Sequence, residues 1–474
     1  MTKRNKTHHL IAAMLLGLSG LVASAPVLAQ DNNAVTLNQA LEMAYGKNPT
    51  LAAERANLSS IDESLTEAYG NALPSIDLQA SITHNENITN GSSLSTLFGG
   101  GGAQQVRSED SDVPKSYSAT LSQPLFTGGR TINAIRQVKA LVGVGAAELA
   151  KTEQDVLLDT VSAYMEVLTN RQVVSLNEAN VNVLRRQLEA AQDRFEVGEI
   201  TRTDVSQAEA RLAGVETSLI SARADLNASE AALTKLTGLR SASLVVPNDL
   251  PSVPPSMDEA IGLAMTNNPG ILQAKSALSA ADAAKDVAVG EYMPIVSLQA
   301  QYKRTEDGSS FQQDSSDASI SAIASWPIFN GGTVLSRNRQ ASYDAMRAHH
   351  QLVEARAGVE EGVTNAWNNL MATRSAIRSS QSQVSANEVA LDGVQQEAEV
   401  GVRTTLDVLN AQQELLDSQV TLARAVQNEA VAAYQLLAAT GLLNARGLGL
   451  NVAIIDPAAA DGVVDRAVDY FLGD

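Results

Sequence analysis

The chain is built from two halves that repeat one another, and this repeat constrains its fold more than any other feature of the sequence. The segment LNQALEMAYGKNPTL at 37–51 matches MDEAIGLAMTNNPGI at 257–271. Further on, QPLFTGG at 123–129 matches WPIFNGG at 326–332. Because the matches keep the same order along the chain, each half is expected to form the same set of structural elements.

The repeat sets the expected domain boundaries. We expect the first structural repeat over 30–255 and the second over 256–442, joined by the proline-rich stretch VPNDLPSVPPS. Residues 443–474 have no counterpart in the first half, and we expect them to pack beside the helices. Residues 1–29 are typical of a signal peptide, with basic residues, then an apolar run, then a small-residue cleavage site. The chain is therefore expected to be exported.

Each half also contains two stretches in which apolar and polar residues alternate. They lie at about 75–84 and 116–126 in the first half, and at about 295–304 and 318–329 in the second. A period of two residues indicates β-strands with one apolar and one polar face. At roughly ten residues each, these stretches have the length that a transmembrane β-strand requires.

Four strands in one chain are too few to close a membrane barrel. An open sheet edge in lipid would leave backbone hydrogen-bonding groups unpaired. Two chains together would supply about eight strands around an interior filled by side chains, whereas three would supply about twelve and leave room for a passage. A homotrimer is therefore the better expectation for a conduit.

The remainder of each half has the pattern of long helices. No proline occurs between Arg130 and Val197, a stretch that would extend roughly 100 Å as one helix. Apolar residues recur there every seven positions, which is typical of coiled-coil packing: Ile135, Val142, Leu149, Val156 and Ala163. The sequence thus predicts a mixed, mainly α fold of two tandem repeats, each with two transmembrane β-strands and long coiled-coil helices.

Composition excludes several kinds of function. The chain has no cysteine, which rules out disulfides, cysteine metal sites and thiol nucleophiles. Its formal net charge of −19 argues against a nucleic-acid partner, because phosphate binding requires a basic surface. The sequence contains no nucleophile–base arrangement, phosphate loop or metal-ligand spacing. We therefore expect neither an enzyme nor a cofactor or metal site.

Taken together, the signal peptide, the two halves, the QPLFTGG and WPIFNGG segments and two Val-Gly-x5-Asp motifs resemble the TolC family of outer-membrane efflux and type I secretion channels. The resemblance implies a homotrimer with a 12-stranded β-barrel in the outer membrane of a Gram-negative bacterium. It also implies a periplasmic α-helical barrel with an equatorial collar, where residues 443–474 would contribute to the collar or form a tail. In that family the channel is the exit duct for an inner-membrane transporter, joined to it by a periplasmic adaptor protein.

The two Val-Gly-x5-Asp motifs are VGEITRTD at 197–204 and VGVRTTLD at 400–407. Each falls between a long helical stretch and a returning one. Gly198 and Gly401 suit the left-handed position that ends a helix, and the aspartate that closes each motif suits the first turn of the next helix. By themselves, these residues are consistent with plain helix-to-helix turns, because acidic residues are common in the first turn of a helix.

The resemblance assigns these turns a role at the closed periplasmic entrance and at the adaptor. It implies that Asp407, with Asn410 one turn further on, faces the channel axis as a gate ring, and that Arg403 locks the gate by bonding to Asp204 and Thr203. A ring of like carboxylates would attract cations and raise its own proton affinity. The chain departs from the best-studied pattern, which has a second acid at position 410 and a tyrosine where this chain has Ala398, and this implies a less negative ring and a weaker lock.

Three aromatic residues at strand ends, Phe126, Trp326 and Phe329, are expected to anchor the sheet at the membrane interface, where aromatic rings favour the headgroup level. Two alternatives to the duct remain open at this stage. A periplasmic coiled-coil scaffold or adaptor would account for the helices but leave the alternating strands without a purpose. A porin that opens without partners would account for the strands but not for the long helices.

Overall fold

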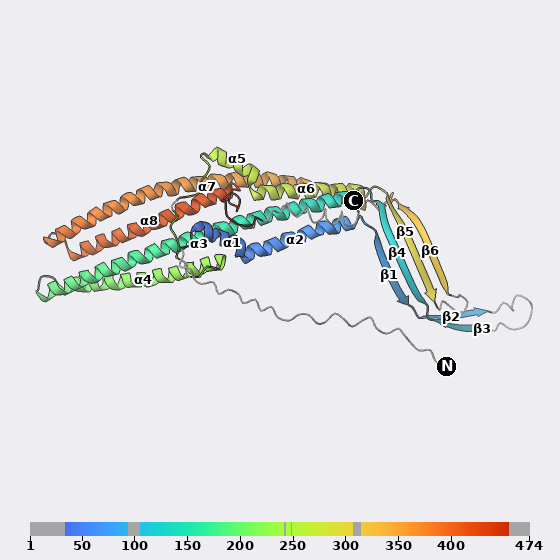
Figure 1. The fold of residues 1–474 in the computed structure, drawn as a ribbon, viewed down its shortest axis with the longest axis horizontal. Helices are drawn as coiled ribbons and strands as arrows, with labels where there is room; N and C mark the ends of the chain where they lie inside the picture. The colour runs from blue at the N-terminus through green and yellow to red at the C-terminus, as the bar shows by residue number, and fades with distance from the viewer. Residues whose placement is uncertain (1–33, 93–104, 241–242, 248, 307–313, 455–474) are drawn as a thin grey trace, which may run out of the picture.

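A computed structural model describes residues 34–92, 105–240, 243–247, 249–306 and 314–454. The predicted signal peptide at 1–29 lies outside the described residues, as does part of the C-terminal segment. The molecule is elongated, with a β-sheet at one end and two long helical hairpins that run away from it (Figure 1).

The two halves form the same helices in the same order. They are α1 Leu37–Lys47, α2 Pro49–Gly70, α3 Arg130–Glu196 and α4 Arg202–Thr237, followed by α5 Met257–Asn267, α6 Pro269–Gly290, α7 Thr333–Glu399 and α8 Thr405–Ala439. The longest helices, α3 and α7, have 67 residues each, so each extends roughly 100 Å. The mainly helical fold with two antiparallel strand pairs that the sequence predicted is therefore confirmed.

Each half contains an Asn-Pro pair that breaks the first helix into two. Proline lacks an N–H and restricts the residue before it, so α1 ends before Asn48 and α2 begins at Pro49. The Asn48 side chain accepts a hydrogen bond from Thr50 N at 2.9 Å and donates one to the Leu236 carbonyl at 3.4 Å. In the second half, Asn268 donates in the same way to the Ala439 carbonyl at 2.9 Å. Each asparagine thus caps one helix and ties it to the end of the returning helix of the same half.

The sheet is antiparallel, with strand order β1-β4-β5-β6. Its strands are β1 Ser75–Ile82, β4 Lys115–Phe126, β5 Ile295–Glu306 and β6 Ser315–Ser325. A second, two-stranded sheet is formed by β2 Asn85–Ser92 and β3 Gln105–Asp112, which lie between β1 and β4 in the chain. The residues of this region are mostly polar and show no apolar–polar alternation in the sequence, so backbone pairing alone defines the two strands.

The register of the four-stranded sheet brings its apolar residues onto one face. Leu78 lies opposite Ala119, Ala119 opposite Tyr302, and Tyr302 opposite Ala318. Partners directly opposite each other share a face, because side chains alternate along a strand. Leu78 remains 81% exposed and Ile320 79% exposed in the single protomer, so this apolar face has no cover from the described residues of its own chain.

A side-chain hydrogen bond made at equivalent positions of the two halves fixes the junction between sheet and helices. Gln123 Nε2 donates to the Ala72 carbonyl at 3.0 Å, and Trp326 Nε1 donates to the Tyr292 carbonyl at 2.9 Å. Gln123 and Trp326 occupy matching positions in QPLFTGG and WPIFNGG. Different donors therefore fulfil the same structural role in each half.

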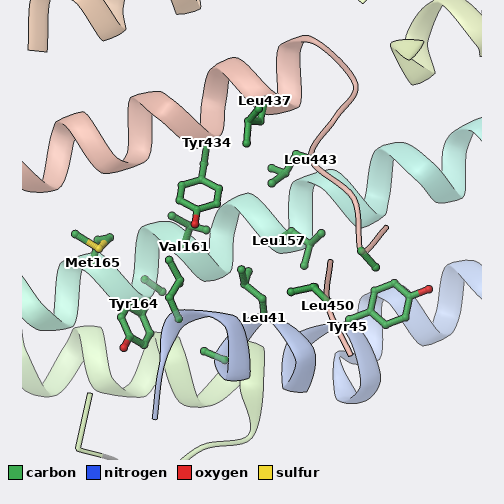
Figure 2. Packing of buried hydrophobic residues seen from close by; sticks show 14 of the residues in the cluster. Leu41, Tyr45, Leu157, Val161, Tyr164, Met165, Tyr434, Leu437, Leu443 and Leu450 are labelled. Atoms are coloured by element: carbon green, nitrogen blue, oxygen red, sulfur yellow. The ribbon is translucent and has the colours of Figure 1, made fainter. Parts of the chain in front are cut away.

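The main apolar core lies partway along the long helices, where α1, α3, α8 and the described end of the chain meet (Figure 2). Leu41, Leu157, Leu443 and Leu450 are among its buried residues. The C-terminal segment is also held by two carboxylates: Glu153 accepts from Ala445 N at 2.7 Å, and Glu42 accepts from Asn451 N at 2.9 Å. The described part of the C-terminal segment therefore packs against the helices.

Candidate functional site: the paired turns at the helix tips

The candidate site comprises the two turns that join α3 to α4 and α7 to α8, at the end of the molecule farthest from the sheet (Figure 1). Gly198 has φ of +80° and Gly401 has φ of +79°. Only glycine adopts this left-handed region without strain, so each turn requires glycine at this position. The two turns are structural copies, as their matching sequences predict.

Each turn is followed by a capping box that uses the aspartate of the motif. The Asp204 carboxylate accepts hydrogen bonds from Thr201 N at 2.9 Å and Thr201 Oγ1 at 2.7 Å. The Asp407 carboxylate accepts from Thr404 N at 3.0 Å and Thr404 Oγ1 at 2.8 Å. Both aspartates therefore lie in the first turn of the returning helix, where they satisfy otherwise unpaired N–H groups.

These hydrogen bonds stabilise the ionised form of both carboxylates. The hydroxyl and backbone N–H of Thr201 hold the pKa of Asp204 below its ordinary value. For Asp407, the backbone N–H and hydroxyl of Thr404 lower the pKa, and the Arg403 guanidinium adds to the effect. In a single protomer Asp407 is thus biased toward the anion, which opposes the rise in proton affinity expected of a ring of carboxylates.

Arg403 forms its ion pair within its own turn. Its Nε lies 2.8 Å from Glu397 Oε2, and this partner raises the arginine pKa further above its ordinary value. Both side chains are about half exposed, so the pair adds little to the stability of the fold. Within one protomer, the structure pairs Arg403 with Glu397 rather than with Asp204 or Thr203.

Asn410 makes a contact that the sequence analysis did not anticipate. Its Oδ1 accepts a hydrogen bond from Arg211 Nη2 at 2.6 Å, which connects α8 to α4. The two residues are far apart in the sequence, and no local pattern marks Arg211 as a partner. The position that would complete the gate ring therefore lies beside a cation from the other hairpin.

The turns also expose apolar side chains that the sequence analysis overlooked. Val197 is 78% exposed and its counterpart Val400 is 74% exposed; Val402 in the second turn is also largely exposed. The Val-Gly pair in each motif is the sequence feature that could have predicted this exposure. A side chain next to a tight surface turn has little of the chain to pack against. Together with Gly198 and Gly401, these valines form an exposed apolar feature at each tip.

The three predicted interface aromatics lie where strands meet helices. Phe126 is the last residue of β4, whereas Trp326 and Phe329 follow the end of β6 and are largely exposed. Trp326 donates its indole N–H to a backbone carbonyl, so its polar atom is hydrogen-bonded within the protein.

None of the described helices combines the length and apolar character needed to span a membrane. Among the described residues, His, Asp and Glu form no cluster suited to a metal ion.

A sheet with one bare apolar face, carried on helical hairpins roughly 100 Å long, defines the class: an outer-membrane channel protomer with a large periplasmic helical part. The sequence profile of the outer membrane efflux protein family matches residues 40–239 and 260–442, which together make up most of the chain. The chain belongs to this family, the TolC family. It is an outer-membrane channel of an efflux pump or a type I secretion system rather than an enzyme, as the resemblance predicted.

Individual relatives agree with this assignment. The chain is 33% identical to the outer membrane efflux protein BepC of Brucella suis biovar 1 over 449 residues, covering 94% of this chain and 93% of BepC. It is 27% identical to the outer membrane protein TolC of Escherichia coli over 464 residues, covering 94% and 90% of the two chains. The outer membrane channel CmeC of Campylobacter jejuni has the same fold, with a TM-score of 0.74 at 16% identity over 92% of this chain and 90% of CmeC.

Proposed function

We propose that three copies of this chain form one continuous duct, which receives substrates from a periplasmic adaptor and an inner-membrane transporter and releases them outside the cell. The observation that supports a trimer is the strand order of the sheet. Among the described residues, β1 and β6 each pair with another strand on one side only. Lipid does not tolerate open strand edges, so β1 of one copy pairs with β6 of the next. Three copies then close a barrel of about twelve strands with an open interior.

The first test is the mass of the particle in detergent, measured by light scattering after size-exclusion chromatography. Three chains per particle are expected. A monomer that stays soluble without detergent would overturn the proposal, because the apolar face of the sheet would then need no lipid.

The paired turns act in this proposal as the periplasmic gate. Asp407 and Asn410 line the constriction, and Arg403 of one protomer bonds to Asp204 and Thr203 of its neighbour. The capping boxes support this role, because they keep both aspartates ionised at the tips. The exposed valines around Gly198 and Gly401 support adaptor docking at the same tips, since apolar side chains in water favour a partner surface.

Conductance in planar bilayers tests the lock. Arg403→Ser is expected to raise single-channel conductance above the wild type, which should conduct poorly at rest. Glu397→Gln is the matched control, because it removes the ion pair inside the turn and leaves Arg403 free to bond across protomers. An equal rise in both variants would show that the turn itself, not a bond between turns, holds the gate. High resting conductance that Arg403→Ser does not change would instead favour a pore that needs no partner.

The ring is tested by cation block. Asp407→Ala is expected to weaken the block of the channel by a trivalent cation added from the periplasmic side, because ionised carboxylates around an axis attract multivalent cations. Asp204→Asn serves as a comparison that changes the first turn only. Equal block in wild type and Asp407→Ala would show that Asp407 does not face the axis.

A further inference from the structure

The two hairpins of one protomer touch near the gate through a small apolar contact. Leu409 of α8 is only 1% exposed and forms a cluster with Val181 and Leu184 of α3 and Val215 of α4. Leu409 therefore inserts between the two helices of the other hairpin. It lies two residues beyond Asp407, so this contact positions the start of α8.

A hydrogen bond crosses between the hairpins directly beside this apolar contact. Arg211 Nη2 donates to Asn410 Oδ1 at 2.6 Å, and Leu212, the neighbour of Arg211, packs against the Leu409 cluster. Other polar pairs of these helices lie within a single hairpin: Arg185–Glu216 and Arg223–Glu178 join α3 to α4, and Arg374–Glu429 joins α7 to α8. The Arg211–Asn410 pair differs from these because it links α4 to α8.

The contact between the two hairpins also contains buried polar groups. A hydrogen bond between α4 and α8 therefore contributes more to holding the hairpins together than it would beside a fully apolar contact. Asn180 of α3 is 3% exposed, and neither of its amide atoms has a hydrogen-bond partner among the described residues. Asn180 precedes Leu184 by four positions and therefore shares its face of the helix. Gln187, three positions after Leu184, also has a buried amide oxygen without a hydrogen-bond partner among the described residues. Buried amides that lack partners gain hydrogen bonds when water reaches them, so this region resists separation less than a fully apolar one.

We propose that Arg211 is a positioning residue of the gate: by bonding to Asn410 it holds α8 against α4 and favours the closed arrangement of the turns. The proposal rests on the proposed gating role of the turns. Asn410 lies three residues after Asp407, so the two side chains project from adjacent helical turns of α8. Loss of the bond therefore frees the segment that carries Asp407, whereas Arg403 acts at the turn itself.

A double-mutant cycle in planar bilayers tests this coupling. Arg211→Gln and Asn410→Ala are each expected to raise conductance roughly two- to tenfold, in line with the coupling energies of contacting residues. The double variant should rise no further than either single variant, because both remove the same bond. Arg223→Gln is the matched control, since it breaks an ion pair of similar exposure inside one hairpin. Independent, multiplicative effects of the two substitutions, or an equal rise in Arg223→Gln, would overturn the proposal.

Asn410→Asp distinguishes the effect of the Arg211–Asn410 hydrogen bond from the effect of the charge of the gate ring. A carboxylate at this position strengthens the bond to Arg211, so conductance should fall below the wild type. In the Arg211→Gln background the same substitution should cause no fall. If Asn410→Asp changes conductance equally in both backgrounds, residue 410 acts through ring charge alone, and the assignment of Arg211 is wrong.

A chemical cross-link tests the contact without relying on the gate. The chain lacks cysteine, so Arg211→Cys combined with Asn410→Cys supplies two unique thiols. A short bifunctional thiol reagent is expected to join them within one protomer, and to lower conductance when it does. Cross-links that form only between protomers would overturn the proposal. A cross-link within the protomer, combined with no effect of Arg403→Ser, would instead show that the contact is real and that the proposed gate is wrong.

Discussion

Tyr164 offers a measurable test of how the middle of the molecule is held together. Its side chain is fully buried, and its hydroxyl oxygen lies 2.6 Å from the Val245 carbonyl oxygen and 2.8 Å from the Val35 carbonyl oxygen. The same hydroxyl accepts a hydrogen bond from Val245 N at 3.1 Å. One side chain on α3 thus joins the start of the described chain to the segment that follows α4, and burial raises the pKa of its phenol.

Tyr164→Phe removes the hydroxyl and leaves the ring in place. Each net hydrogen bond contributes about 1 kcal/mol, and one donated plus one accepted bond are lost. The expected cost is therefore about 2 kcal/mol of local stability, which corresponds to a roughly 30-fold rise in the opening equilibrium. Val35 N donates to the Ser243 carbonyl and Val245 N to the Val35 carbonyl, so these two amides report the opening.

Hydrogen exchange followed by mass spectrometry on the detergent-solubilised protein measures this opening. The peptides that contain Val35 and Val245 should exchange about 30-fold faster in Tyr164→Phe than in the wild type. Tyr434→Phe is the control, because Tyr434 lies in the same core, burial raises its pKa, and its hydroxyl has no hydrogen bond to any described residue (Figure 2). Unchanged exchange in Tyr164→Phe, or an equal change in both variants, would refute the reasoning.

Three further predictions concern titration and burial. Thr404→Ala should return the pKa of Asp407 toward its ordinary value, so that cation block disappears at a higher pH than in the wild type; an unchanged pH profile of block would show that Thr404 does not set this pKa. Burial raises the pKa of Glu153 above its ordinary value, so its contribution to stability is full at acidic pH and is lost as pH rises through the raised pKa. Glu153→Gln should therefore reduce the fall in Tm between acidic and neutral pH, and a fall as steep as in the wild type would contradict this. Asn180→Leu should stabilise the helices by about 1 kcal/mol, because it removes a buried amide that has no hydrogen-bond partner among the described residues; a lower Tm would show that a neighbouring copy in the proposed trimer satisfies the amide.

The sequence by itself determined the features that depend on neighbouring residues. The Asn-Pro pairs end α1 and α5 because proline acts on its immediate neighbours. Gly198 and Gly401 end the longest helices because a positive φ is a property of a single residue. Strands and helices follow from periods of two and seven in the apolar residues, and the repeat shows each pattern twice.

Only the tertiary structure decided which distant side chains meet. Arg211 and Asn410 pair because two hairpins from different halves lie side by side, and neither residue carries a local signal for the other. Arg403 pairs with Glu397 within its turn because the returning backbone brings the two together. The polar strands β2 and β3 form through backbone pairing. Alternation of apolar and polar side chains does not predict this pairing. Local conformation depends on each residue and its neighbours, whereas partner choice depends on where the whole chain places them in space.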